Sequence, residues 1–378
     1  MGEPAPDLRT TGQRFAIPGT FVHGAPLGSG HIHDTWAVTW RERGQDRRYV
    51  HQRLNERVFP DVPGLMENIG RITRHLQRRT EAGADVPAGR ARRGLTLVPA
   101  RDGVDWMRDD TGRAWRTCLL IEGTVTRDCV AEPAQARAAA HAFGLFQRQV
   151  ADLDGPPLRE TIPRFHDTPA RYAAFEAAVA ADNAARAAAA RAEIAFARDQ
   201  APLARGLADP AAGGSLPLRV AHNDTKLNNV LFDAVTGEGL CVIDLDTVMP
   251  GVGLCDFGDL ARTASCRAVE DERDLARVVV DAELFAALAA GWLAGVGDLI
   301  APAEREHLVT AARVMTFESG LRFLTDHLAG DPYFRVRRAG QNLDRCRAQF
   351  ALLRSFTARE GELREDVARV GAGGGEDA

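Results

Sequence analysis

The pattern of hydrophobic and polar positions in the first third of the chain predicts two β-hairpins and one helix. Residues 36–40 alternate large and small side chains, and residues 49–54 extend again after a turn. A second predicted hairpin joins residues 96–98 to residues 115–121. Between the hairpins, apolar residues at spacings of four, three and four predict a helix: Leu65, Ile69, Ile72 and Leu76. The first third is therefore expected to be a small α+β lobe.

The remainder of the chain is predicted to be mainly helical. Residues 134–150 follow Pro133, which suits a first helical turn, and the alanine-rich residues 169–204 have high helix propensity. Two later runs keep helical three-and-four spacing: Val314, Phe317, Leu321, Leu324 and Leu328, then Leu343, Cys346, Phe350 and Leu353. A larger helical lobe is expected to follow the β-rich one.

Length and local composition set the expected domain boundaries. A chain of 378 residues exceeds what one hydrophobic core usually supports, so two lobes are expected. Residues 1–17, which carry Pro, Gly and charge without periodicity, are predicted to be a flexible arm, and residues 362–378 a disordered tail. The N-terminal lobe is then residues 18–121, and the C-terminal lobe residues 127–361.

Charge and composition exclude several classes of partner. The 47 Lys and Arg residues against 52 Asp and Glu give a net charge of −5, without the basic field that nucleic acid or an anionic membrane needs. No apolar run approaches the roughly 18 residues that span a bilayer, and no secretory signal is recognised. The six scattered cysteines indicate reduced thiols. We therefore expect a cytoplasmic protein with no nucleic-acid or membrane partner; its oligomeric state is left open.

The strongest chemical signal lies within residues 220–246. Two apolar, strand-like segments flank a turn there, with Asp224 and Asn229 ahead of the first segment and Asp244 closing the second. Phosphoryl transfer needs a carboxylate that orients the acceptor hydroxyl, and oxygen ligands that hold magnesium against the phosphates. We therefore predict Asp224 as the catalytic base and Asn229 and Asp244 as the metal ligands. The alternative is that all three are ordinary turn residues.

Three neighbouring side chains are predicted to support this site. Asp246 could orient Asp244, touch the metal or cap a turn. His222 is predicted to brace the catalytic loop rather than carry protons. Lys226 could neutralise charge on the transferred phosphate, or it could be a solvated surface lysine.

Three strings carry a family resemblance: HNDTKLNNVLFD from His222, CVIDLDTVMPG from Cys241, and CDFGDLAR from Cys255. They resemble the bacterial N-acetylhexosamine 1-kinases, within the aminoglycoside phosphotransferase and choline kinase superfamily. The likeness runs from about Phe21 to about Phe356, nearly the whole chain. It implies a bilobal, protein-kinase-like α+β fold. It also implies that ATP and Mg²⁺ are used to phosphorylate the anomeric hydroxyl of N-acetylglucosamine or N-acetylgalactosamine, a small-molecule sugar substrate.

On the nucleotide side, four residues between the first two strands form the candidate phosphate loop: Gly28, Ser29, Gly30 and His31. Kinases of this shape usually carry a lysine on the third strand, and this sequence has none there. Arg53 is predicted to supply the cation instead, with Gln52 as the alternative and Glu67 as its ionic partner. The resembled fold crosses between lobes beside adenine, so residues 122–126 form the expected hinge. Backbone groups of Ile121, Glu122 and Gly123 are expected to meet the base.

On the acceptor side, Arg322 and Asp326 lie four residues apart on one predicted helical face, so they can pair or reach one ligand together. Tyr333 can cover an apolar sugar face. The resemblance points to Arg322 and Tyr333 as acceptor contacts; the alternative is an interhelical salt bridge beside an ordinary core aromatic.

Two further functions remain open. The chain could be a kinase of the same superfamily that acts on an aminoglycoside, choline, homoserine or a plain hexose. It could also be a catalytically silent nucleotide-binding module, although neither the base nor a metal ligand is missing from the motif.

Overall fold

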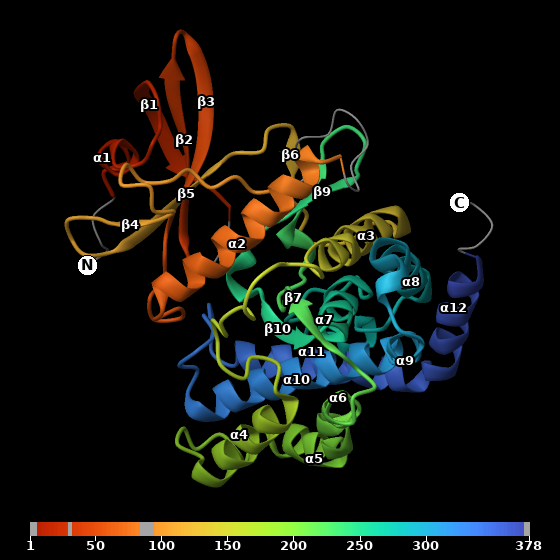
Figure 1. Ribbon diagram of the computed structural model, residues 1–378. Coiled ribbons are helices and arrows are strands. Elements are labelled where there is room, and N and C mark those ends of the chain that lie inside the picture. Colours follow the sequence, from red (N-terminus) through yellow and green to blue (C-terminus); the bar gives the residue numbers. More distant parts are fainter. Residues whose placement is uncertain (1–5, 29–31, 84–93, 374–378) are drawn as a thin grey trace. The chain divides into compact units, whose positions relative to one another are not determined.

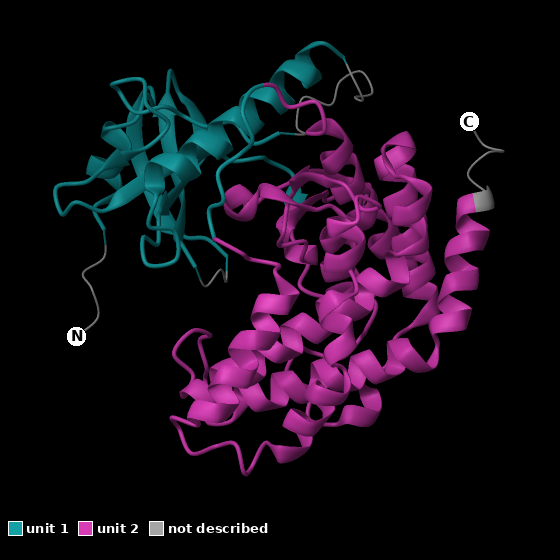
Figure 2. Cartoon of the chain, turned by 60° about the horizontal axis from the view of Figure 1, so that its bottom comes forward, with its two compact units in different colours: residues 1–124, 155–162 teal, residues 125–154, 163–378 magenta. Residues whose placement is uncertain are grey.

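The computed structural model describes residues 6–28, 32–83 and 94–373, which form two compact units (Figure 2). Unit 1 comprises residues 1–124 and 155–162, and unit 2 comprises residues 125–154 and 163–378. The boundary between Thr124 and Val125 falls within the predicted hinge at residues 122–126. The return of residues 155–162 to unit 1 was not predicted.

Hydrogen bonds to one helix explain why residues 155–162 belong to unit 1. Asn68 of α2 (Val62–Glu81) exchanges two hydrogen bonds with the backbone of Arg159, at 2.9 and 3.0 Å. The Arg159 guanidinium also donates to Glu67 at 2.7 Å. These partners lie about ninety residues apart in the chain, so no local sequence pattern predicts their contacts.

Unit 1 is built on one antiparallel sheet (Figure 1). Its strands lie in the order β1 (Thr20–Pro26), β2 (Asp34–Glu42), β3 (Gln45–Arg53), β5 (Ala114–Leu119) and β4 (Met107–Arg108). The first predicted hairpin is confirmed by the β2–β3 register, in which Val38 faces Tyr49. The second is confirmed in part. The turn before β5 leads back to β4, but residues 96–98 also pair with β5. Leu97 bridges Cys118, the Val98 N–H donates to the Thr117 carbonyl at 2.8 Å, and the Leu119 N–H donates to the Thr96 carbonyl at 2.9 Å.

The predicted flexible arm at residues 1–17 is instead structured over its described residues, 6–17. Helix α1 (Leu8–Gln13) begins at Asp7, whose carboxylate accepts the backbone N–H groups of Arg9 and Thr10. Phe15 and Ile17 follow it and are 0% and 3% exposed in the core of the sheet. Because these two apolar side chains gain burial only against distant strands, the local polar composition was misleading.

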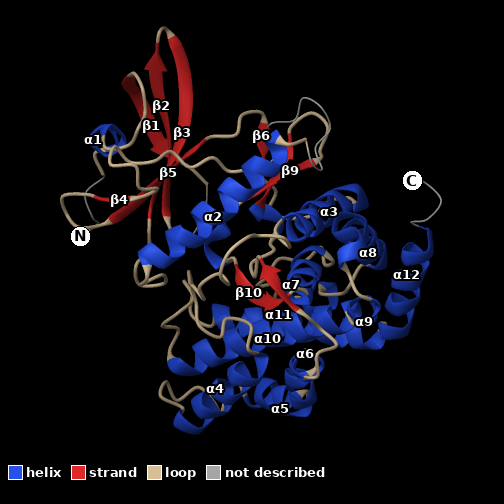
Figure 3. Ribbon diagram, in the orientation of Figure 1, coloured by secondary structure: helices blue, strands red, loops and turns tan. Residues whose placement is uncertain are grey.

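Unit 2 is mainly helical (Figure 3). Helix α10 (Leu308–Ala329) packs against α4 (Thr168–Ala181), α7 (Leu254–Ala264) and α11 (Gln341–Ala358). The apolar residues predicted to be buried in these segments meet in one cluster that includes Phe175, Ile194, Phe317, Leu324 and Phe350. The α+β class, with a β-rich first part and a helical second part, is confirmed.

The alanine-rich segment 169–204 is divided rather than continuous. Helix α4 ends at Asp182, which adopts a left-handed conformation with φ 38°. Helix α5 (Arg191–Asp199) and a 3₁₀ turn (Ala201–Arg205) follow, and α6 (Ala208–Ala212) comes next. Helix propensity alone favoured the whole segment, but it does not show where a chain must turn to pack.

The predicted disordered tail is also wrong over residues 362–373. Helix α12 (Glu360–Gly373) continues to the last described residue and packs against α8 (Ala282–Val296). Leu363 and Val367 lie four residues apart and are 0% and 6% exposed. The glycine and acidic content of this segment hid one short apolar stripe.

One helix of the described chain is apolar enough to resemble a membrane span, contrary to the sequence expectation. Residues 282–299, which include α8, have a mean hydropathy of 1.3, and 44% of this window is buried. Helix α8 packs along α3 (Pro133–Gln149). Gly291 and Gly295 meet the backbone carbonyls of Arg137 and His141 there. The small, apolar residues of α8 therefore allow it to pack closely against α3 inside unit 2.

Replacing Gly291 by Val should destabilise unit 2. The new side chain would meet the backbone of Arg137, so α3 and α8 would have to separate, at a cost of about 1–3 kcal/mol in the free energy of unfolding. Thermal and urea denaturation measure this loss. The matched control is Gly361→Ala in α12, where an added methyl group meets no atom within 4 Å and should be neutral or slightly stabilising. Equal stability of the two variants would contradict the close packing of α3 on α8.

Candidate active site

The predicted catalytic hairpin forms as expected within unit 2. Strand β8 (Val230–Asp233) pairs antiparallel with β9 (Gly239–Val242). A second pair, β7 (Leu218–Ala221) with β10 (Met249–Val252), brings the segment before Asp224 beside the segment after Asp244. Two backbone ladders therefore hold together the two ends of the motif, which are separated by twenty residues of sequence.

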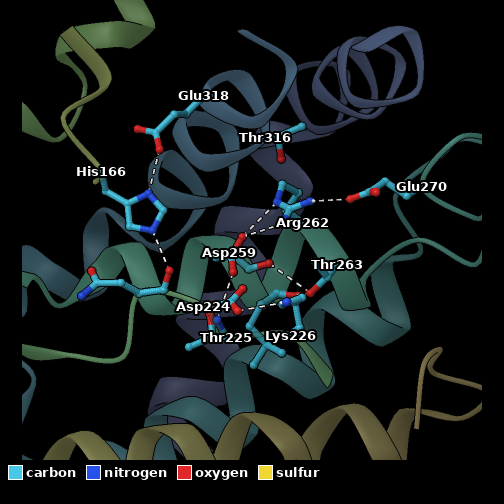
Figure 4. A network of polar contacts seen from close by, with 12 residues as sticks. His166, Asp224, Thr225, Lys226, Asp259, Arg262, Thr263, Glu270, Thr316 and Glu318 are labelled. Atoms are coloured by element: carbon cyan, nitrogen blue, oxygen red, sulfur yellow. Dashed lines mark hydrogen bonds and ion pairs between the residues drawn. The ribbon is translucent and has the colours of Figure 1, made fainter. Parts of the chain in front are cut away.

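Three of the predicted side chains meet directly. Asn229 donates from Nδ2 to the backbone carbonyl of Asp224 at 2.8 Å and to its carboxylate at 3.2 Å. Lys226 forms an ion pair with the same carboxylate at 2.9 Å, as Figure 4 shows. The side chain of Lys226 is 39% exposed as a whole, and its ammonium group is anchored at Asp224. Burial by itself would lower the pKa of Lys226, but the charges of Asp224 and Asp244 outweigh it and raise that pKa.

His222 braces the loop, as predicted. Its Nδ1 accepts the backbone N–H of Asp224 at 3.3 Å, so the ring proton is on Nε2, which donates to the carbonyl of Ile243 at 2.9 Å. The ring is buried and makes T-shaped contacts with Phe143 and Phe146. His222 thereby links the residue before Asp244 to Asp224 itself.

Asp244 lies in a strained and highly charged position. Its backbone is left-handed, with φ 62° and ψ 53°, which is uncommon for a non-glycine residue and costs of the order of 1 kcal/mol or more. Burial and the nearby charges of Asp246 and Asp224 raise the pKa of Asp244 to about 6. Asp246 is 2% exposed and hydrogen-bonds the Asp244 side chain. Of the roles open to Asp246, orienting Asp244 agrees with this contact.

Two carboxylates of α7 accept hydrogen bonds from the backbone of the catalytic loop. Asp256 accepts the backbone N–H groups of His222 at 2.8 Å and Asn223 at 2.7 Å. Asp259 accepts the N–H of Thr225 at 3.0 Å and is paired with Arg262 at 2.7 Å (Figure 4). These contacts allow the loop to keep Asn223 in a left-handed conformation, with φ 65°.

The pKa values of the two α7 carboxylates shift in opposite directions. Burial raises the pKa of Asp256 and outweighs the opposing effects of His222 and the two backbone N–H groups. Burial also opposes ionisation of Asp259, but Arg262 and His166 outweigh it and lower the pKa of Asp259. Asp259 is therefore a fixed negative charge beneath the loop, matched by the buried Arg262.

The oxygen atoms at this hairpin suit a hard divalent cation. Asp224 and Asp244 lie near the Lys226 ammonium group, and burial together with the charges of Asp246 and Asp224 raises the pKa of Asp244. Asn229 uses Nδ2 for Asp224, which leaves its Oδ1 without a hydrogen bond to any described residue. Among the described residues, no set of three or more His, Cys, Asp or Glu side chains is arranged as a metal cage. Magnesium, which keeps several waters and shares phosphate oxygens, needs only one or two such ligands.

Of the predicted acceptor residues, Arg322 is placed best for binding. Its guanidinium lies over the rings of Phe165 and Phe334, at 5.0 and 5.6 Å from their centroids. Within the described chain it has no hydrogen bond or ion pair, and it is half-buried. Burial lowers the pKa of Arg171, and the nearby charge of Arg322 lowers it further. A cationic, aromatic-lined position therefore exists beside this helix.

Asp326 and Tyr333 are placed differently from that expectation. Asp326 is 5% exposed, and its oxygens accept the N–H groups of Tyr333 and Phe334 and the amide of Asn342, at 2.8–3.0 Å. It therefore fixes the loop after α10, and does not pair with Arg322. Tyr333 is 60% exposed, so it is not the core aromatic of the alternative interpretation.

The described nucleotide-side residues of unit 1 make contacts within that unit. Ser29, Gly30 and His31 lie outside the described residues, while Gly28 has φ 75°, which favours glycine. Arg53 pairs with Asp34 at 2.5 Å, and Glu67 pairs with Arg159 at 2.7 Å. The structure thus gives each residue a partner other than the one expected, because Asp34 stands opposite Arg53 in the β2–β3 register.

The predicted hinge residues already make internal contacts. The Ile121 carbonyl accepts the Thr124 hydroxyl at 2.8 Å, and Glu122 pairs with Arg48 at 3.1 Å. Gly123 has φ 69°, so a side chain at this turn would be strained. Gln52, the alternative to Arg53, is engaged by Thr35 at 3.2 Å and Arg116 at 2.8 Å.

Sequence reasoning missed His166 and Glu318, which lie beneath the catalytic loop. His166 connects the Asn223 carbonyl, at 2.9 Å, to the Glu318 carboxylate, at 2.7 Å (Figure 4). One local signal beside His166 is Asp167, a residue type that caps helices, and its carboxylate accepts the Ala170 N–H at 2.9 Å at the start of α4. A glutamate in the middle of an otherwise apolar stretch of α10 was the other available sign.

Comparison with known proteins identifies the family and the fold. Residues 23–307 match the model of the phosphotransferase enzyme family. An aminoglycoside phosphotransferase from Alicyclobacillus acidocaldarius superposes with a TM-score of 0.62 at 15% identity, over 98% of each chain. Spectinomycin phosphotransferase APH(9)-Ia, solved with ADP and spectinomycin, has a TM-score of 0.54 at 11% identity, over 97% of this chain and 99% of that one. Choline kinase from Cryptosporidium parvum Iowa II has a TM-score of 0.54 at 13% identity, over 95% and 96%. At these identities the likeness establishes the fold.

Replacing Asp256 by Asn should weaken the catalytic loop. Asp256 accepts two backbone N–H groups, whereas an amide offers one acceptor and turns a donor toward the other N–H. We expect a loss of about 1–3 kcal/mol in the free energy of unfolding, measured by urea denaturation. The control is Asp298→Asn at an exposed position, which should change stability by less than about 0.5 kcal/mol. An Asp256→Asn variant as stable as this control would contradict the proposed support of the loop.

Proposed function

The chain belongs to the phosphotransferase enzyme family, and from this premise we propose that it transfers the γ-phosphoryl group of ATP to the anomeric hydroxyl of an N-acetylhexosamine. The products are the sugar 1-phosphate and ADP. The observation that carries the transfer chemistry is the direct contact of Asp224 with Asn229 and Lys226, at 3.2 and 2.9 Å. The acceptor assignment rests on the resemblance of the motif strings and on the cationic surroundings of Arg322.

Asp224 is the proposed catalytic base. Its carboxylate is held by Asn229 and Lys226 on a loop whose backbone is fixed by α7, so it can orient an acceptor hydroxyl and accept its proton. Lys226 supplies a positive charge beside the carboxylate and can face the phosphate as charge moves onto the leaving oxygen. Such fixed charges need little reorganisation during the reaction.

Asn229 and Asp244 would hold magnesium, with Asp246 orienting Asp244. When bound there, magnesium would supply positive charge that offsets the negative charge of the nucleotide phosphates. The free Oδ1 of Asn229 and the carboxylate of Asp244 are the oxygen donors available at the two ends of the hairpin. The ADP bound in the spectinomycin phosphotransferase structure supports a nucleotide as the phosphoryl carrier.

The surroundings of Arg322 support a neutral acceptor over a cationic one. Arg322 and Arg171 place two guanidinium groups close together, and neither is neutralised by an ion pair among the described residues. A quaternary amine or a polyamine would be repelled by these charges. An acetamido carbonyl or sugar hydroxyls can accept hydrogen bonds from a guanidinium. Tyr333, which is largely exposed, could lie against an apolar sugar face.

The acceptor is tested by offering purified protein ATP and magnesium with N-acetylglucosamine, N-acetylgalactosamine, glucose, kanamycin or choline. We expect ADP release with an N-acetylhexosamine and at least about tenfold lower kcat/KM with glucose, because an unpaired polar contact costs about 1.4 kcal/mol or more. Turnover confined to kanamycin or choline would reject the sugar assignment while keeping the phosphotransferase chemistry. No turnover with any acceptor would favour a silent binding module.

The roles at the hairpin are separated by two substitutions. Asp224→Asn should reduce kcat by at least about 100-fold, because the base is lost, while leaving the Kd for magnesium–ATP within about threefold. Asp244→Ala should instead weaken magnesium-dependent ATP binding, measured by calorimetry with and without the metal. If Asp224→Asn weakened ATP binding as much as turnover, it would not be the base.

A further inference from the structure

A buried imidazole connects the catalytic loop to the helix that carries Arg322. Nε2 of His166 lies 2.9 Å from the backbone carbonyl of Asn223, the residue before Asp224. Nδ1 lies 2.7 Å from one oxygen of Glu318, whose other oxygen accepts the Thr168 hydroxyl at 2.6 Å. The side chains of His166 and Glu318 are only 8% and 1% exposed. Figure 4 shows the contact of the ring with Glu318.

The partners of His166 determine the protonation of this site. A backbone carbonyl can only accept a hydrogen bond, so Nε2 must carry a proton. An ionised Glu318 can also only accept, so Nδ1 must carry a proton as well. Both ring nitrogens therefore donate, which makes His166 an imidazolium paired with a buried carboxylate. This pairing leaves no buried charge uncompensated.

We infer that His166 is a positioning residue for Asp224, held as an imidazolium by Glu318 so that it fixes the Asn223 carbonyl. This role rests on the proposed function, in which Asp224 is the base. Asn223 has a left-handed φ of 65°, so the peptide that leads into Asp224 needs external contacts to keep its orientation. Asp256 holds its N–H side, at 2.7 Å, and His166 holds its carbonyl side.

The same pair couples the loop to the proposed acceptor contact. Glu318 and Arg322 lie one turn apart on α10. Phe165, which precedes His166 in the chain, packs beneath the Arg322 guanidinium at 5.0 Å. A shift of Arg322 on acceptor binding would therefore act on Glu318 through α10 and on His166 through Phe165.

The charges around the ring agree with this assignment. Burial lowers the pKa of His166, but Glu318 and Asp259 outweigh burial and the opposing charge of Arg322, so the pKa lies above 6.5. Burial raises the pKa of Glu318, but His166, Arg322 and Thr168 outweigh it, so that pKa lies below 4.5. The histidine contribution to stability is present below pH 6.5 and is lost as pH rises through its raised pKa. The glutamate contribution is present above pH 4.5 and is lost as pH falls through its lowered pKa.

Glu318→Gln provides an informative variant because it can preserve every contact without charge. The amide nitrogen can donate to Nδ1 of a neutral His166, Nε2 still donates to Asn223, and the amide oxygen accepts from Thr168. His166→Ala, by contrast, leaves the Asn223 carbonyl without its donor. The matched control is Glu193→Gln, which breaks a 2.6 Å ion pair with Arg347 elsewhere in unit 2.

The charge state is read without any enzymatic assay. In the full-length protein labelled with ¹⁵N-histidine, the His166 signal is identified by its loss in His166→Ala. We expect both ring nitrogens to be protonated at pH 7 in the wild type, and only Nε2 in Glu318→Gln. An imidazole that titrates at or below pH 6.5 in the wild type would overturn the inference.

The positioning role is read by hydrogen exchange and kinetics together. His166→Ala should speed amide exchange in residues 222–226 by at least about tenfold, since a hydrogen bond to a charged group contributes about 1.5–3 kcal/mol. It should lower kcat by about 10–100-fold with the KM for ATP nearly unchanged. In the wild type, kcat should fall as pH rises through the raised pKa of His166, because the ion pair with Glu318 is then lost. Glu318→Gln should retain most of kcat and lack this alkaline fall. Glu193→Gln should affect stability alone.

Unchanged exchange and unchanged kcat in folded His166→Ala would refute the positioning role. If His166→Ala does not fold, Glu318→Gln decides the question. A Glu318→Gln variant that loses kcat but keeps the alkaline fall of the wild type would equally refute the positioning role. A wild type inactive on every acceptor would reject the proposed function, whereas the exchange and ring-protonation measurements would still decide whether the contact orders this loop.

Discussion

Carboxylates that accept backbone N–H groups hold the proposed active site together. Asp256 and Asp259 extend from α7 and bind three N–H groups of the loop from His222 to Thr225. A buried carboxylate without such partners would be costly, and a loop with a left-handed Asn223 would be poorly stable without them. The buried carboxylates of α7 and the loop backbone therefore stabilise each other, and together they fix the orientation of Asp224.

Charge is balanced locally around this support. Asp259 faces Arg262, Asp224 faces Lys226, and Glu318 faces His166. At Asp244, burial and the charges of Asp246 and Asp224 oppose ionisation more than Lys226 favours it. A magnesium–nucleotide complex would place positive charge at this end of the hairpin.

The buried contacts also suggest how acceptor binding and chemistry could be linked. Arg322 and Glu318 belong to one helix, and His166 joins that helix to the peptide before Asp224. Packed helices move as units, so a small displacement of α10 would be transmitted through a short, charged contact rather than through solvent. Specificity and base orientation would then share a single structural element.

Much of this protein could be predicted from its sequence because the relevant information is local. Alternation and helical spacing gave the β2–β3 hairpin, α2, α3, α10 and α11, and the 220–246 motif gave the hairpin that joins Asp224, Asn229 and Asp244. Tertiary structure alone decided the ordered α1 and α12, the return of residues 155–162, the partners of Arg53 and Glu67, the internal role of Asp326, and the His166–Glu318 contact. Each depends on burial against, or a hydrogen bond to, a residue remote in the chain, and such energies arise only when distant segments pack together.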